Sequence, residues 1–496
     1  MTPDPTAELR RGFYLLLTML GVAVCVAKIA GAENVFEPSR YQPPTGASYG
    51  ADREAPPQRL WPPTRPEPTP MFGSNDRSRF ATVKALVEDG TYVVGRRENF
   101  RSTTDYRDSG VIFDDGYQSL DKVMDPKTGE FYSSKPPLFP TLVAGEYWLL
   151  HHAFGLSIDR HRWWVVAVIL LTFNALPFAV YLRLLAVLIE HHGRTDFGKL
   201  FAFTVAASAT FLTTFSATLN NHTPAACCVV FAVYPLLRPG AWDTRGALVT
   251  SGFFAGLLTT LELPALSLAV GLFVPLAVAR RGRSLWYVAG FAVPMAALFA
   301  ANYAAMGRWL PAYGEFGGPW YDFPGSHWAK LKLPGPKSGI DFADEPKAVY
   351  AFHLLLGHHG WFSLTPVWLL GLAGLVVQAR RGVPEWLTRP GDAAWTPAKL
   401  APLTLAVSAV VFGFYVVRTN NYGGFCCCAR WLMWLTPLWT TGTLPAADAA
   451  GRLRVGRAVA GLLLAASAFS VAYPAWNPWR PPWVLQLCGV AGWVRY

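Results

Sequence analysis

The sequences SNDRSRFATV at residues 74–83 and GEFYSSKPPLFP at residues 129–140 bound the polar insert of an otherwise apolar chain. Hydrophobic residues make up 52% of the 496 residues and charged residues only 15%. Soluble domains carry about 25% charged residues. This balance predicts a membrane protein in which most of the chemistry lies in the insert and apolar spans fold around it.

The formal net charge is +11, and its distribution matters more than its size. In a soluble protein such a charge can indicate nucleic-acid binding. Here the arginines cluster beside hydrophobic runs, and no basic patch with interleaved aromatic residues is found on a soluble domain. Arginines in that position indicate orientation in a membrane. We therefore expect the lipid bilayer, and no nucleic acid, as a partner.

Eleven apolar stretches are candidates for transmembrane helices. They lie at residues 13–32, 163–182, 200–219, 223–237, 246–262, 264–279, 285–306, 360–378, 400–417, 429–447 and 457–474. Positive residues fall in every second loop, which places the N-terminus in the cytoplasm. The sequence thus predicts an all-α polytopic membrane protein of about eleven transmembrane helices, with a large extracytoplasmic loop domain after the first helix. Cytoplasmic arginine clusters favour the inner, cytoplasmic membrane.

The expected organisation has six parts. They are the cytoplasmic N-terminus with the first transmembrane helix (1–32), an extracytoplasmic loop domain with a proline-rich spacer (33–162), a transmembrane bundle (163–306), an aromatic outer loop (307–359), a second bundle (360–474) and an extracytoplasmic tail (475–496). Ala30-Gly31-Ala32 also resembles a signal-peptidase site, so a cleaved signal is the alternative to an anchor. The aromatic loop fits a structural belt or a roof over a lipid or sugar site.

Within the outer domain, residues 77–90 have the pattern of an amphipathic helix and residues 105–125 that of an acidic loop. Asp76 lies just before this helix, where a carboxylate can cap the helix or accept a proton from an acceptor hydroxyl. Lys135 precedes two prolines, which stiffen the backbone and would hold its ammonium in a defined place. Such a cation suits the phosphate of a lipid carrier, or it snorkels at the membrane interface.

Several other polar residues leave alternatives open. Glu262 lies at the outer end of a span, within Glu262-Leu263-Pro264, which forms either a kink or a tight hairpin. It belongs to a site or faces water at a helix end. His358 and His359 could bind a divalent metal, but no carboxylate has a suitable local spacing, so no metal ligand and no cofactor are assigned. The cysteines match no zinc spacing and are expected to be small buried residues.

Three motifs, in this order, resemble the polytopic GT-C glycosyltransferases, which include the protein O-mannosyltransferases, the aminoarabinose transferases of lipid A and their bacterial relatives. NDRSRF at 75–80 followed by LVEDGTY at 86–92 is similar to the start of their first extracytoplasmic loop. FYSSKPPL at 131–138 resembles a Tyr-Phe-x-Lys-Pro-Pro-Leu segment farther along that loop. NYGG at 421–424, with ARWL at 429–432, is similar to a Gly-x-Arg-Tyr entry into a late span. Together the motifs span most of the chain.

The resemblance implies an inverting transferase that moves a sugar from a polyprenyl-phosphate donor to a protein, lipid or glycan acceptor outside the cytoplasm. The absence of a nucleotide fingerprint agrees with such a donor. Asp76 would be the general base or would orient the acceptor. The residues that would contact substrate are Arg79, Lys135, Glu262, Asn421, Tyr422 and Arg430.

The first motif departs from the family pattern, in which the loop often has an Asp-Glu pair. Only Asp76 is present here, so a second carboxylate would have to come from elsewhere, with Asp114 or Asp115 as candidates. Two other functional classes stay open. A transporter or flippase should show internal repeats and charges at mid-span depth, and neither is clear in the sequence. A non-catalytic envelope protein that binds polyprenyl phosphate would tolerate the single carboxylate.

Overall fold

The computed structural model describes residues 5–32, 71–114, 116–238, 243–279, 281–332, 339–388, 394–475, 477–494 and 496. The proline-rich spacer and Asp115 therefore lie outside the described residues. Within them most of the chain is helical, which confirms the prediction of a mainly helical protein.

The helices of the described residues mostly follow the apolar stretches of the sequence. They are α1 (Pro5–Ala30), α2 (Ser74–Lys84), α3 (Leu138–Phe154), α4 (Arg162–Leu170), α5 (Leu176–His192), α6 (Asp196–Ser208), α7 (Leu212–Phe215), α8 (His222–Leu237), α9 (Arg245–Leu261), α10 (Leu266–Ala279), α11 (Arg281–Met306), α12 (Lys347–Leu355), α13 (Trp361–Leu364), α14 (Trp368–Thr388), α15 (Pro397–Arg418), α16 (Thr436–Ala450), α17 (Arg454–Ala472) and α18 (Trp483–Val490).

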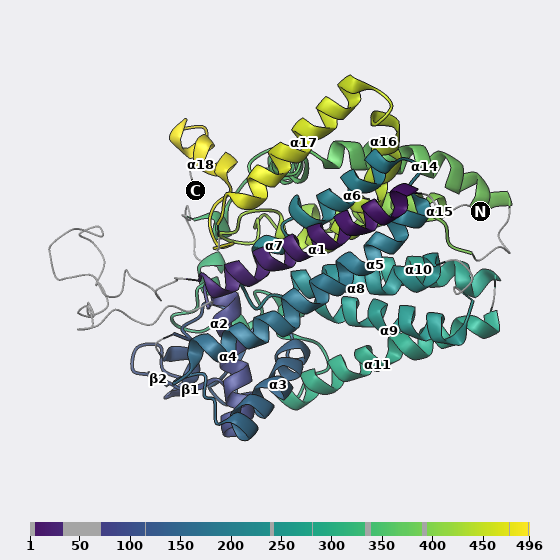
Figure 1. The fold of residues 1–496 in the computed structure, drawn as a ribbon. Coiled ribbons are helices and arrows are strands. Elements are labelled where there is room, and N and C mark those ends of the chain that lie inside the picture. Colours follow the sequence, from purple (N-terminus) through teal and green to yellow (C-terminus); the bar gives the residue numbers. More distant parts are fainter. Residues whose placement is uncertain are drawn as a thin grey trace.

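Six helical segments of the described residues are long and apolar enough to cross a membrane. They are Thr6–Ala30, Arg162–His192, Asp196–Phe215, Arg281–Met306, Pro397–Arg418 and Arg454–Ala472. The second of these joins α4 to α5 through a π-helical turn. Two further apolar helical segments, His222–Leu237 and Leu263–Ala279, are shorter. The long helices run alongside one another, and α2 and the strands lie at the end of the bundle away from the start of α1 (Figure 1).

Two predicted spans are interrupted next to a proline. The stretch 360–378 begins as the single turn α13, which ends before Pro366, and continues as α14. The stretch 429–447 begins with a 3₁₀ segment, Arg430–Leu435, before α16. Both breaks adjoin a proline, Pro366 in the first stretch and Pro437 in the second. Proline has no N–H to donate, and its ring disfavours the α conformation in the residue before it, which accounts for the interruptions.

Four short strands form a sheet that was not predicted from the sequence. They are β1 (Gly95–Glu98), β2 (Arg107–Ser109), β3 (Lys122–Met124) and β4 (Glu130–Ser133), arranged antiparallel in the order β2-β1-β4-β3. The all-α fold and the acidic loop over 105–125 are corrected accordingly. Strands of three or four residues are too short to show a clear alternation of polar and apolar side chains.

The aromatic outer loop packs on this sheet. The Phe323 ring lies 5.4 Å from the ring of Phe131, and the Trp320 ring lies 5.9 Å from that of Tyr132. Arg97 of β1 donates to the carbonyl oxygen of Pro324 over 2.9 Å. Trp309 of the same loop is 60% exposed. The loop therefore covers the sheet with one part and presents aromatic residues outward with another.

Helices α9 and α11 approach each other closely because glycines face the contact. A Cβ atom on Gly290 would lie 2.1 Å from the carbonyl oxygen of Val249, and one on Gly252 would lie 2.0 Å from that of Tyr287. Small residues at such positions let two helix backbones pack without intervening side chains.

We expect Gly290→Ala to destabilise the protein by about 1–3 kcal/mol, because the added methyl group must push the two helices apart. Gly282→Ala is a matched control on the same helix, since a Cβ there would meet nothing within 4 Å. Thermal unfolding in detergent measures both variants. Equal melting temperatures for the two variants would contradict the close contact between α9 and α11.

Candidate functional site

A hairpin places Lys135 beside a buried carboxylate. Strands β3 and β4 pair with Lys122 opposite Ser133. Asp121 comes just before β3 and Lys135 comes just after β4, so both residues lie at the open end of the hairpin. The Lys135 ammonium lies 2.7 Å from Oδ1 of Asp121. Burial alone would raise the pKa of Asp121, but the charge and hydrogen bond of Lys135 outweigh it, and the pKa lies below its usual value. Asp121 is therefore a carboxylate at neutral pH.

Helix α2 docks on this hairpin through its hydroxyl groups. Ser78 Oγ donates to the carbonyl oxygen of Asp121 and lies 2.6 Å from Ser133 Oγ. Ser74 Oγ accepts from the backbone N–H of Leu120. Almost every residue of α2 is buried, including Asp76 and Arg79. The helix is thus enclosed on all sides and is not amphipathic as the sequence suggested.

Asp76 is fully buried, and its two carboxylate oxygens have different surroundings. Its Oδ2 accepts from the backbone N–H groups of Phe72 and Gly73, each over 3.1 Å, which caps the start of α2. Its Oδ1 is buried and makes no hydrogen bond of good geometry within the described residues. Burial raises the pKa of Asp76 to about 7, against the opposing effects of the Gly73 N–H, the guanidinium groups of Arg79 and Arg77 and the nearby Trp479 side chain.

Arg79 connects α2 to the start of α8 and the end of α9. It donates to Oδ1 of Asn221 over 2.6 Å and to the carbonyl oxygen of Leu219 over 3.2 Å. Asn221 in turn donates to Oε1 of Glu262 over 2.8 Å. Glu262 follows the last residue of α9 in an extended conformation, and the 3₁₀ turn Leu263–Ala265 comes after it. The predicted kink or hairpin is therefore a break between α9 and α10, and its carboxylate points into the site.

Arg430 approaches Glu262 from the other side. Its Nη1 lies 3.0 Å from Nε2 of His222, and His222 Nδ1 contacts Oε1 of Glu262. A guanidinium group can only donate, so Nε2 of His222 is the acceptor. Nδ1 of His222 then carries the proton and donates the hydrogen bond to Glu262. Arg430 also packs over the ring of Trp479, 5.2 Å from its centroid. Trp479 in turn packs against Gly73, where a Cβ would lie only 2.6 Å from the indole.

The three cations of the site, Arg79, Lys135 and Arg430, influence one another. Burial lowers the pKa of Arg79 to about 10; Asp76 and Asp121 oppose this effect and Arg430 adds to it. Burial also lowers the pKa of Lys135, with Asp121 opposing and both arginines adding to the decrease. An anion bound among the three groups would relieve this repulsion.

Asn421 and Tyr422 lie on a neighbouring loop and are engaged with other groups. Asn421 donates to Oδ1 of Asp341 and accepts from the backbone N–H groups of Gly423 and Gly424. The Tyr422 hydroxyl donates to Glu345. The carbonyl oxygen of Gly423 accepts from Nε of Arg430 over 3.0 Å, so this loop orients Arg430.

The structure brings Asp76, Arg79, Lys135, Glu262 and Arg430 together, and it adds two residues that were not named as site residues. Asp121, and not Asp114, is beside Lys135; Asp114 follows a 3₁₀ turn and holds Tyr117 through its backbone. The other addition is His222. The turn sequence DPKTG at 125–129, typical of a hairpin, could have indicated the position of Asp121. No comparable local signal points to His222.

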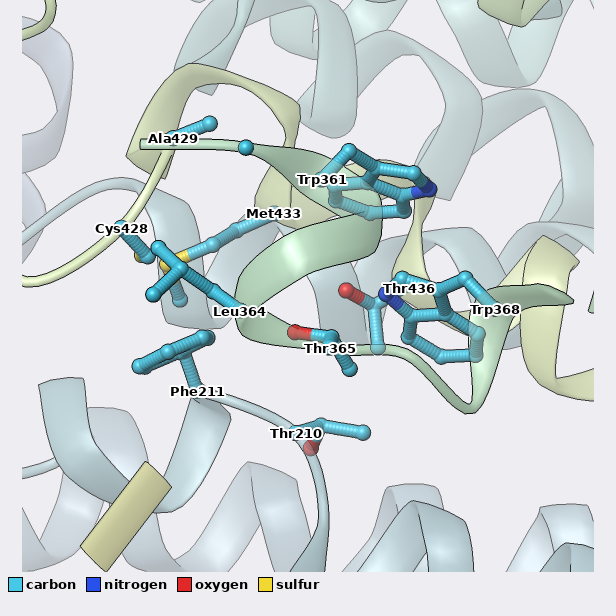
Figure 2. A pocket seen from close by; sticks show the side chains of 11 residues that line it. Thr210, Phe211, Trp361, Leu364, Thr365, Trp368, Cys428, Ala429, Met433 and Thr436 are labelled. Atoms are coloured by element: carbon cyan, nitrogen blue, oxygen red, sulfur yellow. The ribbon is translucent and has the colours of Figure 1, made fainter. Parts of the chain in front are cut away.

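A small cavity is lined in part by Cys428, Ala429, Met433 and Thr436 (Figure 2). Its volume is about 20 Å³, and its other walls include Phe211 and Trp361. This is room for about one water molecule, so the cavity is part of the packing around these residues. The cysteines of the apolar runs and of the 426–428 triplet are buried and form no disulfide, as expected from the sequence.

Asp121→Asn is expected to destabilise the fold by about 3 kcal/mol, because the Lys135 ammonium then lacks its partner in a largely buried place. Lys135→Met should restore much of this loss in the double variant. Chemical unfolding in detergent of the two single variants and the double variant gives the coupling free energy, and Asp105→Asn, at an exposed position, is the control. Purely additive effects would show that the pair is not coupled.

Comparison with known proteins gives only distant likenesses. No protein-family model and no curated protein match the chain. Among solved structures it is similar to the oligosaccharyltransferase of Archaeoglobus fulgidus. The apo form aligns with a TM-score of 0.46 and 11% identity over 95% of this chain and 57% of that chain.

Two further structures of that protein align in the same way. The complex with Zn and sulfate has a TM-score of 0.49 and 14% identity over 94% of this chain and 53% of that one. The complex with an inhibitory peptide and a dolichol-phosphate has a TM-score of 0.46 and 11% identity over 95% of this chain and 57% of that one. The chain thus spans about half the length of the Archaeoglobus oligosaccharyltransferase, to which it is distantly similar in structure.

Proposed function

We propose that the chain is an inverting, GT-C-like membrane glycosyltransferase that moves a sugar from a polyprenyl-phosphate donor to an acceptor outside the cytoplasm. The observation that supports this most directly is the meeting of three cations from distant segments beside buried carboxylates. Arg79 comes from α2, Lys135 from the end of β4, and Arg430 from the segment before α16. This arrangement fits the motifs that resemble the GT-C enzymes.

The donor phosphate would bind among these cations. The Lys135 side chain is 20% exposed while Arg430 is 8% exposed, so Lys135 would meet the phosphate first. Arginine donates in a planar fork that matches phosphate oxygens, and a lysine ammonium acts as a point charge. Both stabilise the negative charge that develops on the phosphate as it leaves. In this proposal Asn421 and Tyr422 act through the loop that orients Arg430, and Glu262 acts through Asn221 and His222.

Asp76 would act as the general base. The acceptor oxygen forms a bond to the anomeric carbon, the bond from that carbon to the phosphate oxygen breaks, and the acceptor proton passes to Oδ1 of Asp76. A base is most effective when its pKa is near the working pH, and burial brings the pKa of Asp76 to about 7. Because Asp76 is fully buried, the acceptor reaches it only after a covering group, such as the Trp479 side chain, moves.

The proposed setting is a cytoplasmic membrane crossed by about eleven helices, with the N-terminus in the cytoplasm. In it the shorter helices α8, α9, α10 and α16, together with the 21-residue α14, complete the bundle. The α2 helix, the sheet and the aromatic loop form the outer domain. Arg10 supports a common end for three helices, since this residue of α1 binds Glu190 at the end of α5 and Asp196 at the start of α6. That end is opposite the site, as the positive-inside pattern requires.

Asp76→Asn should abolish sugar transfer while the protein still inserts and folds, because the amide cannot accept the acceptor proton. The assay measures polyprenyl phosphate released from a mixture of polyprenyl-phosphate sugars by purified protein in lipid. Asp89→Asn, at an exposed position on the turn that follows α2, is the matched control and should retain full activity.

Full activity of Asp76→Asn would remove Asp76 from the reaction. Donor binding without turnover by the wild-type protein would identify a non-catalytic polyprenyl-phosphate-binding protein. Uptake of a labelled solute into proteoliposomes without transfer would identify a transporter.

The proposed base also predicts the pH dependence of transfer. Asp76 must be deprotonated to accept a proton, so kcat/KM should fall about tenfold for each pH unit below its pKa of about 7 and level off above it. Initial rates at fixed ionic strength measure this profile. A profile that is flat from about pH 5.5 to pH 8 would contradict a base of raised pKa.

A further inference from the structure

Outside the candidate site, three side chains have the composition of a metal site. Glu345 lies just before α12, His353 is in its last turn, and His358 is in the turn between α12 and α13. One carboxylate oxygen and one ring nitrogen from each histidine lie within 4.8 Å of one another. The sequence alone offered no carboxylate near His358. The fold supplies Glu345, which precedes α12, whereas His358 follows it.

The backbone is shaped to hold the two imidazoles. The rings of His353 and His358 are stacked, with centroids 4.0 Å apart and planes 24° apart. A Cβ on Gly357 would lie 2.2 Å from Nδ1 of His353. Any residue other than glycine at 357 would displace the His353 ring.

Second-layer groups hold His358 in place. Nδ1 of His358 lies 2.6 Å from Nδ1 of His359, so one of the two nitrogens carries a proton shared between them. Histidines that bind metals commonly hold their other ring nitrogen in such a hydrogen bond. The Tyr496 hydroxyl lies 2.6 Å from Nε2 of His358 and 2.9 Å from Oε1 of Glu345. A polar atom thus already stands between two of the three candidate ligands.

We propose that Glu345, His353 and His358 bind one divalent transition-metal ion of the zinc type, with the Tyr496 hydroxyl next to the fourth position. Two imidazoles and one carboxylate are a ligand set that zinc accepts. Magnesium and calcium prefer oxygen ligands alone and match this set poorly.

The ion would stabilise the loop that carries the Tyr422 motif. Glu345 accepts from the Tyr422 hydroxyl, and the Tyr422 ring stacks on His359 at 5.0 Å. The next residue, Gly423, accepts from Arg430. Metal binding at Glu345 would thus fix the course of the chain from 421 to 430, a structural role that stands apart from the reaction at Asp76.

The test measures zinc binding to the full-length protein, purified in detergent without a polyhistidine tag and stripped with a chelator. Titration with zinc chloride, followed by calorimetry and by elemental analysis after gel filtration, should give one ion per chain. Zinc should also raise the melting temperature, because it binds the folded state. His353→Ala and Glu345→Gln should each weaken binding by at least about tenfold.

His152→Ala is the matched control, since it removes an exposed imidazole on α3, and it should bind zinc like the wild type. Glu345→Gln keeps the size of the side chain, so it tests the ligand even where His353→Ala fails to fold. A wild-type protein that retains no zinc, or variants that bind it as tightly as the wild type, would overturn the proposal.

Discussion

The Glu262 carboxylate is the acceptor on which the geometry of the site depends. Asn221 and His222 both donate to its Oε1, and they in turn accept from Arg79 and Arg430. A carboxylate buried among apolar helices is costly unless its lone pairs are used. Here two donors meet that need. The start of α8 and the end of α9 are thereby fixed to each other and to both arginines.

The long helices could be predicted from the sequence because their cause is local. A run of apolar residues long enough to span a bilayer needs no knowledge of its neighbours, and the stretches 285–306 and 400–417 became α11 and α15. The sheet could not be predicted in the same way. Its strands are three or four residues long, and what holds them is pairing across the sheet and cover by Phe323, both of which are tertiary.

The site was predictable only in part, for a related reason. Residue types and the resemblance to a family pointed to Asp76, Lys135 and Arg430 singly, and the fold was needed to bring them together. The carboxylate beside Lys135 is Asp121, which precedes the other strand of a hairpin. The pairing of the two strands, which the sequence did not predict, brings it there in place of Asp114. No local sequence signal points to His222, because its role depends on Arg430, which is 208 residues away.

The contact of Trp479 with Gly73 has a consequence for the order in which the protein is made. The start of α2 is synthesised early, yet one wall around it is an indole that follows about four hundred residues later. Until that segment has been translated and has packed against α2, Asp76 lacks its cover and Arg430 lacks the ring beneath it. The nascent chain therefore holds an unfinished site through most of its synthesis, and the site closes only when the late segment arrives.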